Sequence, residues 1–177
     1  MNGLPALLFD GTNDFFSFNG NFLVGSDYTI FVVEARGSSD ISKYFLSTSG
    51  TQGGVSYKNT KPHFGYRSDN FITQAHYYND TDKNIGAFKS IINRINSFVF
   101  SIDYGKSIYT NGGGKTSNST QTSPIISYLD ATIGNYGGAT YYNGTIAEII
   151  FYTRALTDQE RQGVEAYLSK KWGIKIS

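Results

Sequence analysis

Short runs of alternating apolar and polar residues, separated by Gly, Asn, Ser or Pro, make up most of the chain. The segment DYTIFVVEARG (27–37) is apolar on both faces, which predicts a strand buried inside a sandwich. Similar runs predict about ten or eleven strands in all. The further runs are ALLFDGTNDFFSFNG, KYFLSTSG, GVSYKN, PHFGYRS, ITQAHYYN, NSFVFSIDYG, SIYTNGGG, ATIGNYGG and GTIAEIIFYTR. Asn111 and Gly112 predict a hairpin turn, and the Ser/Thr-rich residues 114–124 predict a loop.

The C-terminal segment LTDQERQGVEAYLSKKWGI has a different period. Thr157 precedes Glu160 by three residues, which is the spacing of a capping box. An apolar residue then recurs every fourth position, at Val164, Leu168 and Trp172, as on one stripe of a helix. Gly173 follows as a typical residue after a helix C-terminus. The sequence therefore predicts one all-β domain over residues 1–177 with a single C-terminal α-helix.

Composition and charge exclude several classes of protein. The 15 Lys and Arg residues are scattered and leave a net charge of +1, so no basic stripe for nucleic acid is present. Cysteine is absent, which excludes disulfides and thiolate metal sites. No apolar run approaches 18 residues and no signal-peptide pattern opens the chain, so we expect no membrane insertion. Aromatic residues are 16% of the chain, which suits strands and also a sugar-binding surface.

Two blocks carry a family resemblance: GLPALLFDGTNDFFSF near the N-terminus and YYNGTIAEIIFYTRALTDQERQGVEAYLSKKWGI at the C-terminus. Together with SDYTIFVVEAR and IYTNG, they resemble the laminin-G-like, concanavalin A-like lectin/glucanase superfamily. The resemblance is strongest to the pentraxin-like jelly-roll modules of bacterial surface and phage proteins. It implies a two-sheet antiparallel jelly-roll sandwich that binds carbohydrate, often with Ca²⁺, or mediates adhesion. It also implies that the domain is excised from, or appended to, a larger protein.

Glu148 lies alone in the apolar run of the C-terminal block. Glucanases of this fold use two glutamates on one strand face, and retaining chemistry needs two carboxyl groups about 5 to 5.5 Å apart. Here Ile150 and Phe151 stand where further carboxylates would be. We therefore interpret Glu148 as structural, paired with Arg154 or with backbone N–H groups near the helix, and we expect no catalytic residues.

Candidate ligand-binding residues come from the middle strands and from a Gly-rich loop. Sugars stack C–H faces on aromatic rings, and their hydroxyls suit Asn, Arg and His. The same residues also suit cross-strand pairs that only stabilise a sheet. The candidates are Tyr57, His63, Tyr66, Arg67, His76, Tyr78, Asn135, Tyr136 and Tyr141.

Oxygen-bearing side chains cluster at Asp10, Asn13 and Asp14. They are the best candidates for a Ca²⁺ site, the one cofactor that the resemblance suggests. The alternative is a turn in which these side chains accept neighbouring backbone N–H groups. Because Ca²⁺ takes about six to eight oxygen ligands and only three are local, the turn is the favoured interpretation.

The sequence predicts a non-catalytic carbohydrate-binding or adhesion module of a cell-surface or virion protein, with a glycan or surface polysaccharide as its partner. The alternative is a structural appendage, such as a phage capsid decoration or tail domain, that contacts other structural protein chains and binds no glycan. Either protein would be extracellular, at a cell surface or on a virion, and a parent protein would have to provide that location.

Overall fold

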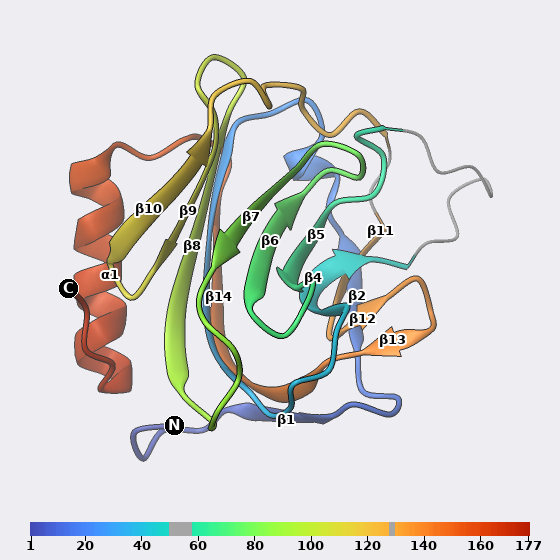
Figure 1. The fold of residues 1–177 in the computed structure, drawn as a ribbon. Helices are drawn as coiled ribbons and strands as arrows, with labels where there is room; N and C mark the ends of the chain where they lie inside the picture. Colours follow the sequence, from blue (N-terminus) through green and yellow to red (C-terminus); the bar gives the residue numbers. More distant parts are fainter. Residues whose placement is uncertain (50–57, 128–129) are drawn as a thin grey trace.

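Two antiparallel sheets of six strands pack face to face in the computed structural model, which describes residues 1–49, 58–127 and 130–177 (Figure 1). Sheet A has the order β1 (Leu7–Asp10), β14 (Asn143–Tyr152), β3 (Tyr28–Arg36), β8 (Asn93–Ser101), β9 (Gly105–Thr110) and β10 (Gly113–Asn118). Sheet B has the order β2 (Phe16–Asn19), β11 (Asp130–Ile133), β4 (Lys43–Thr48), β5 (His63–Tyr66), β6 (Phe71–Ala75) and β7 (Asp80–Asn84). A 3-10 turn spans Asn21–Leu23. The strands β12 (Asn135–Tyr136) and β13 (Thr140–Tyr141) form a small separate hairpin.

β3 is buried on both of its faces, as the sequence predicts. Ile30 and Val32 belong to the main core between the two sheets. Phe31 and Val33 point the other way, into a second apolar cluster under the C-terminal helix. The strand alternates sides at every residue, so one apolar run contributes side chains to the main core and to the second apolar cluster.

The helix α1 (Asp158–Trp172) begins and ends as the sequence predicts. Thr157 accepts a hydrogen bond from the Glu160 backbone N–H at 3.3 Å, and the Thr157 backbone N–H donates to the Glu160 carboxylate at 2.9 Å. Gly173 closes the helix in the left-handed region at φ 66°. Figure 1 shows α1 lying outside sheet A. No helix in the described ranges is long and apolar enough to cross a membrane.

α1 covers the outer face of sheet A through apolar and charged contacts. Leu168 and Trp172 are buried in the second apolar cluster. Beside them, Arg161 and Glu165 form a buried ion pair at 2.5 Å, and the Ser97 hydroxyl donates to Glu165 at 2.6 Å. The face is therefore closed by packing and by a paired charge that has its own hydrogen bond.

Two polar edge strands differ from the prediction. Residues 113–118 form β10 on the edge of sheet A, within the segment predicted as a loop. Residues 80–84, which read DTDKN, form β7 on the edge of sheet B. An edge strand exposed to solvent needs no apolar alternation, so neither segment carries the usual signal of a strand. The strand predicted over 54–59 falls largely outside the described residues.

The predicted turn between β9 and β10 is confirmed. Asn111 and Gly112 have φ of 50° and 78°, the left-handed pair that a two-residue hairpin requires.

Candidate functional site

Glu148 points toward the helix and away from the interior of the sandwich. The Trp172 indole N–H donates to its carboxylate at 2.6 Å, and the Lys171 ammonium lies 3.0 Å away. A bulge at Ala147 causes this orientation, because the extra residue moves Glu148 from the face of Ile146 onto the helix side of β14. Glu148 therefore joins the helix to the sheet.

Arg154, the partner suggested by the sequence, pairs elsewhere. Its guanidinium contacts Glu160 at 2.8 and 2.9 Å beside the helix N-terminus. Lys171 and Trp172 take its place at Glu148 because the C-terminal end of α1, and not its beginning, packs over that part of β14.

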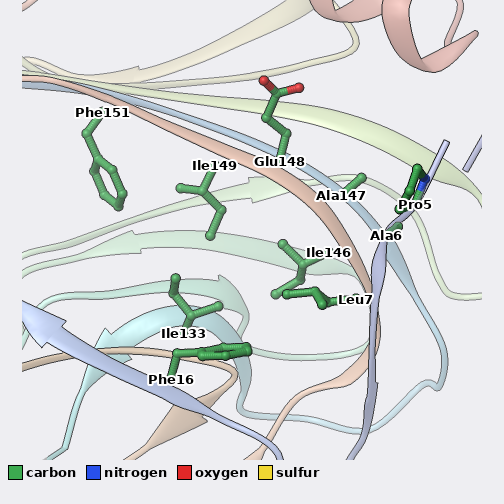
Figure 2. A pocket seen from close by; sticks show the side chains of 10 residues that line it. All are labelled: Pro5, Ala6, Leu7, Phe16, Ile133, Ile146, Ala147, Glu148, Ile149 and Phe151. Carbon is green, nitrogen blue, oxygen red and sulfur yellow. The ribbon is translucent and has the colours of Figure 1, made fainter.

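An apolar cleft of about 410 Å³ opens on the other side of β14, at the edge of the sandwich (Figure 2). In Figure 2 the side chain of Ile149 points into the cleft, whereas Glu148 points away from it. The lining residues are Pro5, Ala6, Leu7, Phe16, Ile133, Ile146, Ala147, Glu148, Ile149 and Phe151. A cleft with this lining offers apolar contact and few groups for polar recognition or acid–base chemistry.

The outer face of sheet B, by contrast, gathers aromatic rings. The Tyr44 ring lies 4.7 Å from the His63 ring and 5.2 Å from the Tyr136 ring, and the rings of His63 and Tyr136 are 5.2 Å apart. Tyr44 comes from β4, His63 from β5 and Tyr136 from the hairpin β12–β13. We call these three residues the aromatic wall. Tyr44 and His63 are buried and Tyr136 is half-buried, so the wall presents mainly Tyr136 to solvent.

A charged group faces the wall across the same sheet. The Arg67 guanidinium contacts Asp80 through a short hydrogen bond, and its Nε lies 3.3 Å from Asp82. The side chains of Arg67, Asp80 and Asp82 are 36%, 21% and 33% exposed, so solvent reaches all three. We call these three residues the charged group.

Small residues lie in the sheet beneath the aromatic wall and the charged group. His63 pairs with Ala75, which pairs with Asp80, and in the next row Gly65 pairs with Thr73. Gly65, Thr73 and Ala75 are themselves buried, so the surrounding side chains cover them. A Cβ on Gly65 would lie 2.6 Å from the Tyr44 backbone, so only glycine allows this approach of β4 and β5.

The turn between β6 and β7 holds two tyrosines in an unusual conformation. Tyr77 and Tyr78 have φ of 59° and 54°, a left-handed pair that Asn and Gly normally supply. Their rings lie 4.4 Å apart, and Tyr78 is 72% exposed. Bulky residues in this region are genuine outliers, and such outliers cluster at functional sites.

Burial and the neighbouring charges set the protonation of the aromatic wall. Burial lowers the pKa of His63 to about 4, although its hydrogen bond to the Lys61 carbonyl raises that pKa. His63 is therefore neutral near pH 7. Burial also raises the pKa of Tyr44 and of Tyr136. All three rings are uncharged at neutral pH, as a stacking surface requires.

The structure brings three of the predicted ligand residues together: His63, Arg67 and Tyr136. Tyr78 lies at the exposed turn between β6 and β7. Tyr57 lies outside the described residues.

Two predicted ligand residues lie in the interior, out of reach of a ligand on the surface. Tyr66 is fully buried, and its hydroxyl donates to Glu34 at 2.6 Å between the sheets. His76 is also fully buried, with Nδ1 donating to the Ser123 carbonyl at 3.0 Å and Nε2 accepting from the Tyr28 hydroxyl at 2.8 Å. Both side chains point inward because β5 and β6 alternate sides at every residue.

The remaining two candidates shape the hairpin β12–β13. Asn135 is buried, and its side-chain oxygen accepts the Gly138 N–H at 2.9 Å, which holds the turn. The Tyr141 ring lies 6.3 Å from the Phe15 ring. Neither residue belongs to the aromatic wall.

The candidate calcium residues form a turn. The Asp10 carboxylate accepts the Thr12 N–H at 2.7 Å, and the Asp14 carboxylate accepts the Asp10 N–H at 3.0 Å. Among the described residues, no group of three or more His, Cys, Asp or Glu side chains gathers there or elsewhere. These hydrogen bonds are those of the turn that the sequence favours over a Ca²⁺ site with its about six to eight oxygen ligands.

Sequence reasoning missed Tyr44, Tyr77, Asp80 and Asp82. The carboxylates had a usable signal, because an Asp-x-Asp spacing on a strand places both side chains on one face. If DTDKN had been predicted as a polar edge strand, Asp80 and Asp82 would have been placed beside Arg67.

No family model matches the sequence, and no curated protein matches it. Solved structures are similar in fold. The CBM40 of the Ruminococcus gnavus IT-sialidase, bound to α2,3 sialyllactose, gives a TM-score of 0.66 at 13% identity, over 92% of this chain and 97% of that chain. A native heptameric SAP-like pentraxin from Limulus polyphemus gives 0.62 at 16% identity, over 90% and 81%. The fold is that of the lectin-like jelly rolls.

The NanB sialidase from Streptococcus pneumoniae also matches, with a TM-score of 0.64 at 19% identity, over 89% of this chain but 27% of that chain. The similarity therefore covers about a quarter of that enzyme. The predicted all-β jelly-roll sandwich with one C-terminal helix is confirmed, and so is the resemblance to the concanavalin A-like superfamily at the level of fold.

Proposed function

We propose that this protein is a non-catalytic carbohydrate-binding or adhesion module whose site is the outer face of sheet B. The observation that carries the proposal is that the aromatic wall and the charged group lie close together on this face. Tyr136 is the half-buried ring on which a sugar can stack its C–H face. Arg67 and Asp82 offer hydrogen-bonding groups to its hydroxyls.

The comparisons support this proposal through fold and ligand together. Two of the similar structures are CBM40 modules described as bound to α2,3 and α2,6 sialyllactose. They share the sandwich and span almost their whole length in the match. A sugar-binding module is therefore compatible with a domain of this size and architecture.

The charges of the site favour binding over hydrolysis. Asp80 and Asp82 lie on one strand face, as a catalytic pair would, but both contact Arg67. Both carboxylates are thus engaged by one cation, whereas a glycosidase needs one carboxyl group placed to donate a proton to the leaving group. Glu148, the other carboxylate considered for catalysis, faces the helix.

A single site of this kind binds weakly. Ring stacking and two or three hydrogen bonds, less the lost solvation, give an affinity on the order of micromolar to millimolar. Several copies on one particle or cell would be needed for firm adhesion. We therefore propose that the domain acts outside the cell, at a cell surface or on a virion, as part of a larger protein.

NMR titration of the isotope-labelled domain with a broad glycan panel tests the proposal. We expect amide shifts confined to β4–β7 and the hairpin β12–β13, and their loss in Tyr136→Ala with the fold intact. Tyr167→Ala is the matched control, because Tyr167 is a 53% exposed tyrosine on the helix, away from sheet B. Hydrolysis of any glycan by the wild type that disappears in Asp82→Asn would overturn the non-catalytic assignment.

The second candidate is the structural appendage that contacts protein chains and binds no glycan. The apolar cleft at the open edge favours it, since Leu7 and Phe16 are 53% and 52% exposed there. The absence of shifts with any glycan, together with tight binding to a coat or tail protein that Phe16→Ser abolishes, would establish this alternative.

A further inference from the structure

The charges that act on the aromatic wall at His63 sum to a negative value. Asp80, Arg67 and Asp82 are the charged groups that act on His63, and two anions with one cation leave a charge of −1. The wall adds no cation, since His63 is neutral near pH 7. Lys43 pairs with Tyr66 in the register of β4 and β5, so its side chain is directed to the opposite face.

The two segments outside the described residues do not alter this sum. Residues 50–57 read GTQGGVSY and residues 128–129 read YL, and neither segment contains a charged side chain.

Arg67 already pairs with two carboxylates. One guanidinium nitrogen is bonded to Asp80, and Nε lies 3.3 Å from Asp82. A sugar carboxylate that reached Arg67 would lie beside two like charges, Asp80 and Asp82. Like charges brought together at an interface strongly disfavour the wrong partner.

The aspartates suit a different ligand. A carboxylate has about four lone-pair sites, and a single contact with Arg67 leaves acceptor sites on Asp80 and on Asp82. Hydroxyl groups that donate to a carboxylate form charge-assisted hydrogen bonds, which are stronger than bonds between neutral groups. A pyranose could place its C–H face against Tyr136 and direct neighbouring hydroxyls toward the aspartates.

We infer that the outer face of sheet B binds a neutral, hydroxyl-rich sugar and discriminates against sugars that carry a carboxylate. This inference rests on the proposed function and adds the class of its ligand. It sets this chain apart from the CBM40 structures bound to sialyllactose, since sialic acid carries a carboxylate.

Calorimetric titration with matched pairs of sugars tests the inference. Each pair consists of a neutral glycan and its acidic counterpart. Examples are lactose with α2,3 sialyllactose, and galactose oligomers with galacturonate oligomers. We expect the neutral member of a binding pair to bind at least tenfold more tightly. Its affinity should not change between low and high salt, because no net charge is neutralised.

The variant Asp80→Asn/Asp82→Asn sharpens the test, because it removes both anions and keeps the side-chain shapes. We expect the acidic member to gain at least tenfold in affinity, since Arg67 is then free to bind its carboxylate. Arg154→Gln is the matched control for general charge effects, since Arg154 lies beside the helix N-terminus.

The outcomes are distinguishable. Tighter, salt-sensitive binding of the acidic member to the wild type would overturn the ligand class and leave the proposed function intact. An unchanged preference in the double aspartate variant would also overturn the ligand class. Failure of both members of every pair to bind would overturn the proposed function, and the ligand class with it.

Discussion

The two outer faces of the sandwich differ in how far their side chains are exposed to solvent. On sheet A, α1 covers the face, and Phe31 and Val33 are buried beneath Leu168 and Trp172. On sheet B, no helix of the described chain covers the face. There the aromatic wall and the charged group remain partly in contact with solvent.

This difference means that the covered face of sheet A contributes mainly to stability, whereas the outer face of sheet B is available for recognition. Apolar side chains under α1 contribute to folding because they leave water completely. Charged side chains on sheet B remain partly hydrated, and exposed ion pairs contribute about 0 to 1 kcal/mol to stability. Changes under the helix should therefore affect folding, and changes in the exposed charged group of sheet B should mainly affect binding.

The largest expected effect is at the centre of the closed face. Trp172→Ala should lower the free energy of unfolding by about 3 to 5 kcal/mol, because a large buried aromatic side chain is lost. Chemical denaturation followed by circular dichroism measures the change. Val164 is only partly buried, so Val164→Ala should cost less, about 1 kcal/mol. A cost below 1 kcal/mol for Trp172→Ala would mean that the helix is not docked as described.

The second effect is a pH dependence of sheet B. The pKa of His63 is about 4 in the folded state and 6.5 when exposed, so the unfolded state binds more protons between these values. The free energy of unfolding should fall as the pH drops from 6.5 to 4, with His63 contributing about 3 kcal/mol.

Melting curves across that range, compared with His63→Asn, measure the contribution. His76 contributes in the same direction, since burial lowers its pKa too. The variant should therefore retain part of the slope, and an identical slope in both proteins would contradict the account of His63.

The smallest effect is at the link between helix and sheet. Glu148→Gln keeps an acceptor for the Trp172 N–H but removes the charge that pairs with Lys171. Because Glu148 is partly exposed, we expect a loss of about 1 kcal/mol. Glycan affinity should stay unchanged, since Glu148 lies on the helix side of sheet A. A lower glycan affinity in this variant would break the separation between the two faces.

The elements predictable from sequence are those with strong local signals. The capping box at Thr157 and Glu160 and the left-handed turn at Asn111 and Gly112 depend on residues close together in the chain. The double-sided burial of β3 follows from its unbroken apolar run. β7 and β10 were missed because partner strands, not their own polar residues, make them strands.

The candidate site was less predictable because it depends on which side of a strand each residue faces. In the segment PHFGYRS, His63 and Arg67 share one face and Tyr66 takes the other. Composition alone groups the three, whereas the two-residue period separates them. Tyr44 comes from β4, and only the sheet register shows that it meets His63.

The contact between Trp172 and Glu148 makes one end of the molecule optically distinct. Trp172 is the single tryptophan among 14 tyrosines, and it is only 4% exposed. Its fluorescence emission therefore reports on one event, the docking of α1 on sheet A. A sugar on the outer face of sheet B meets tyrosines and a histidine but no tryptophan. Detachment of the helix should shift the tryptophan emission to longer wavelength, whereas occupation of the sugar site should leave it unchanged.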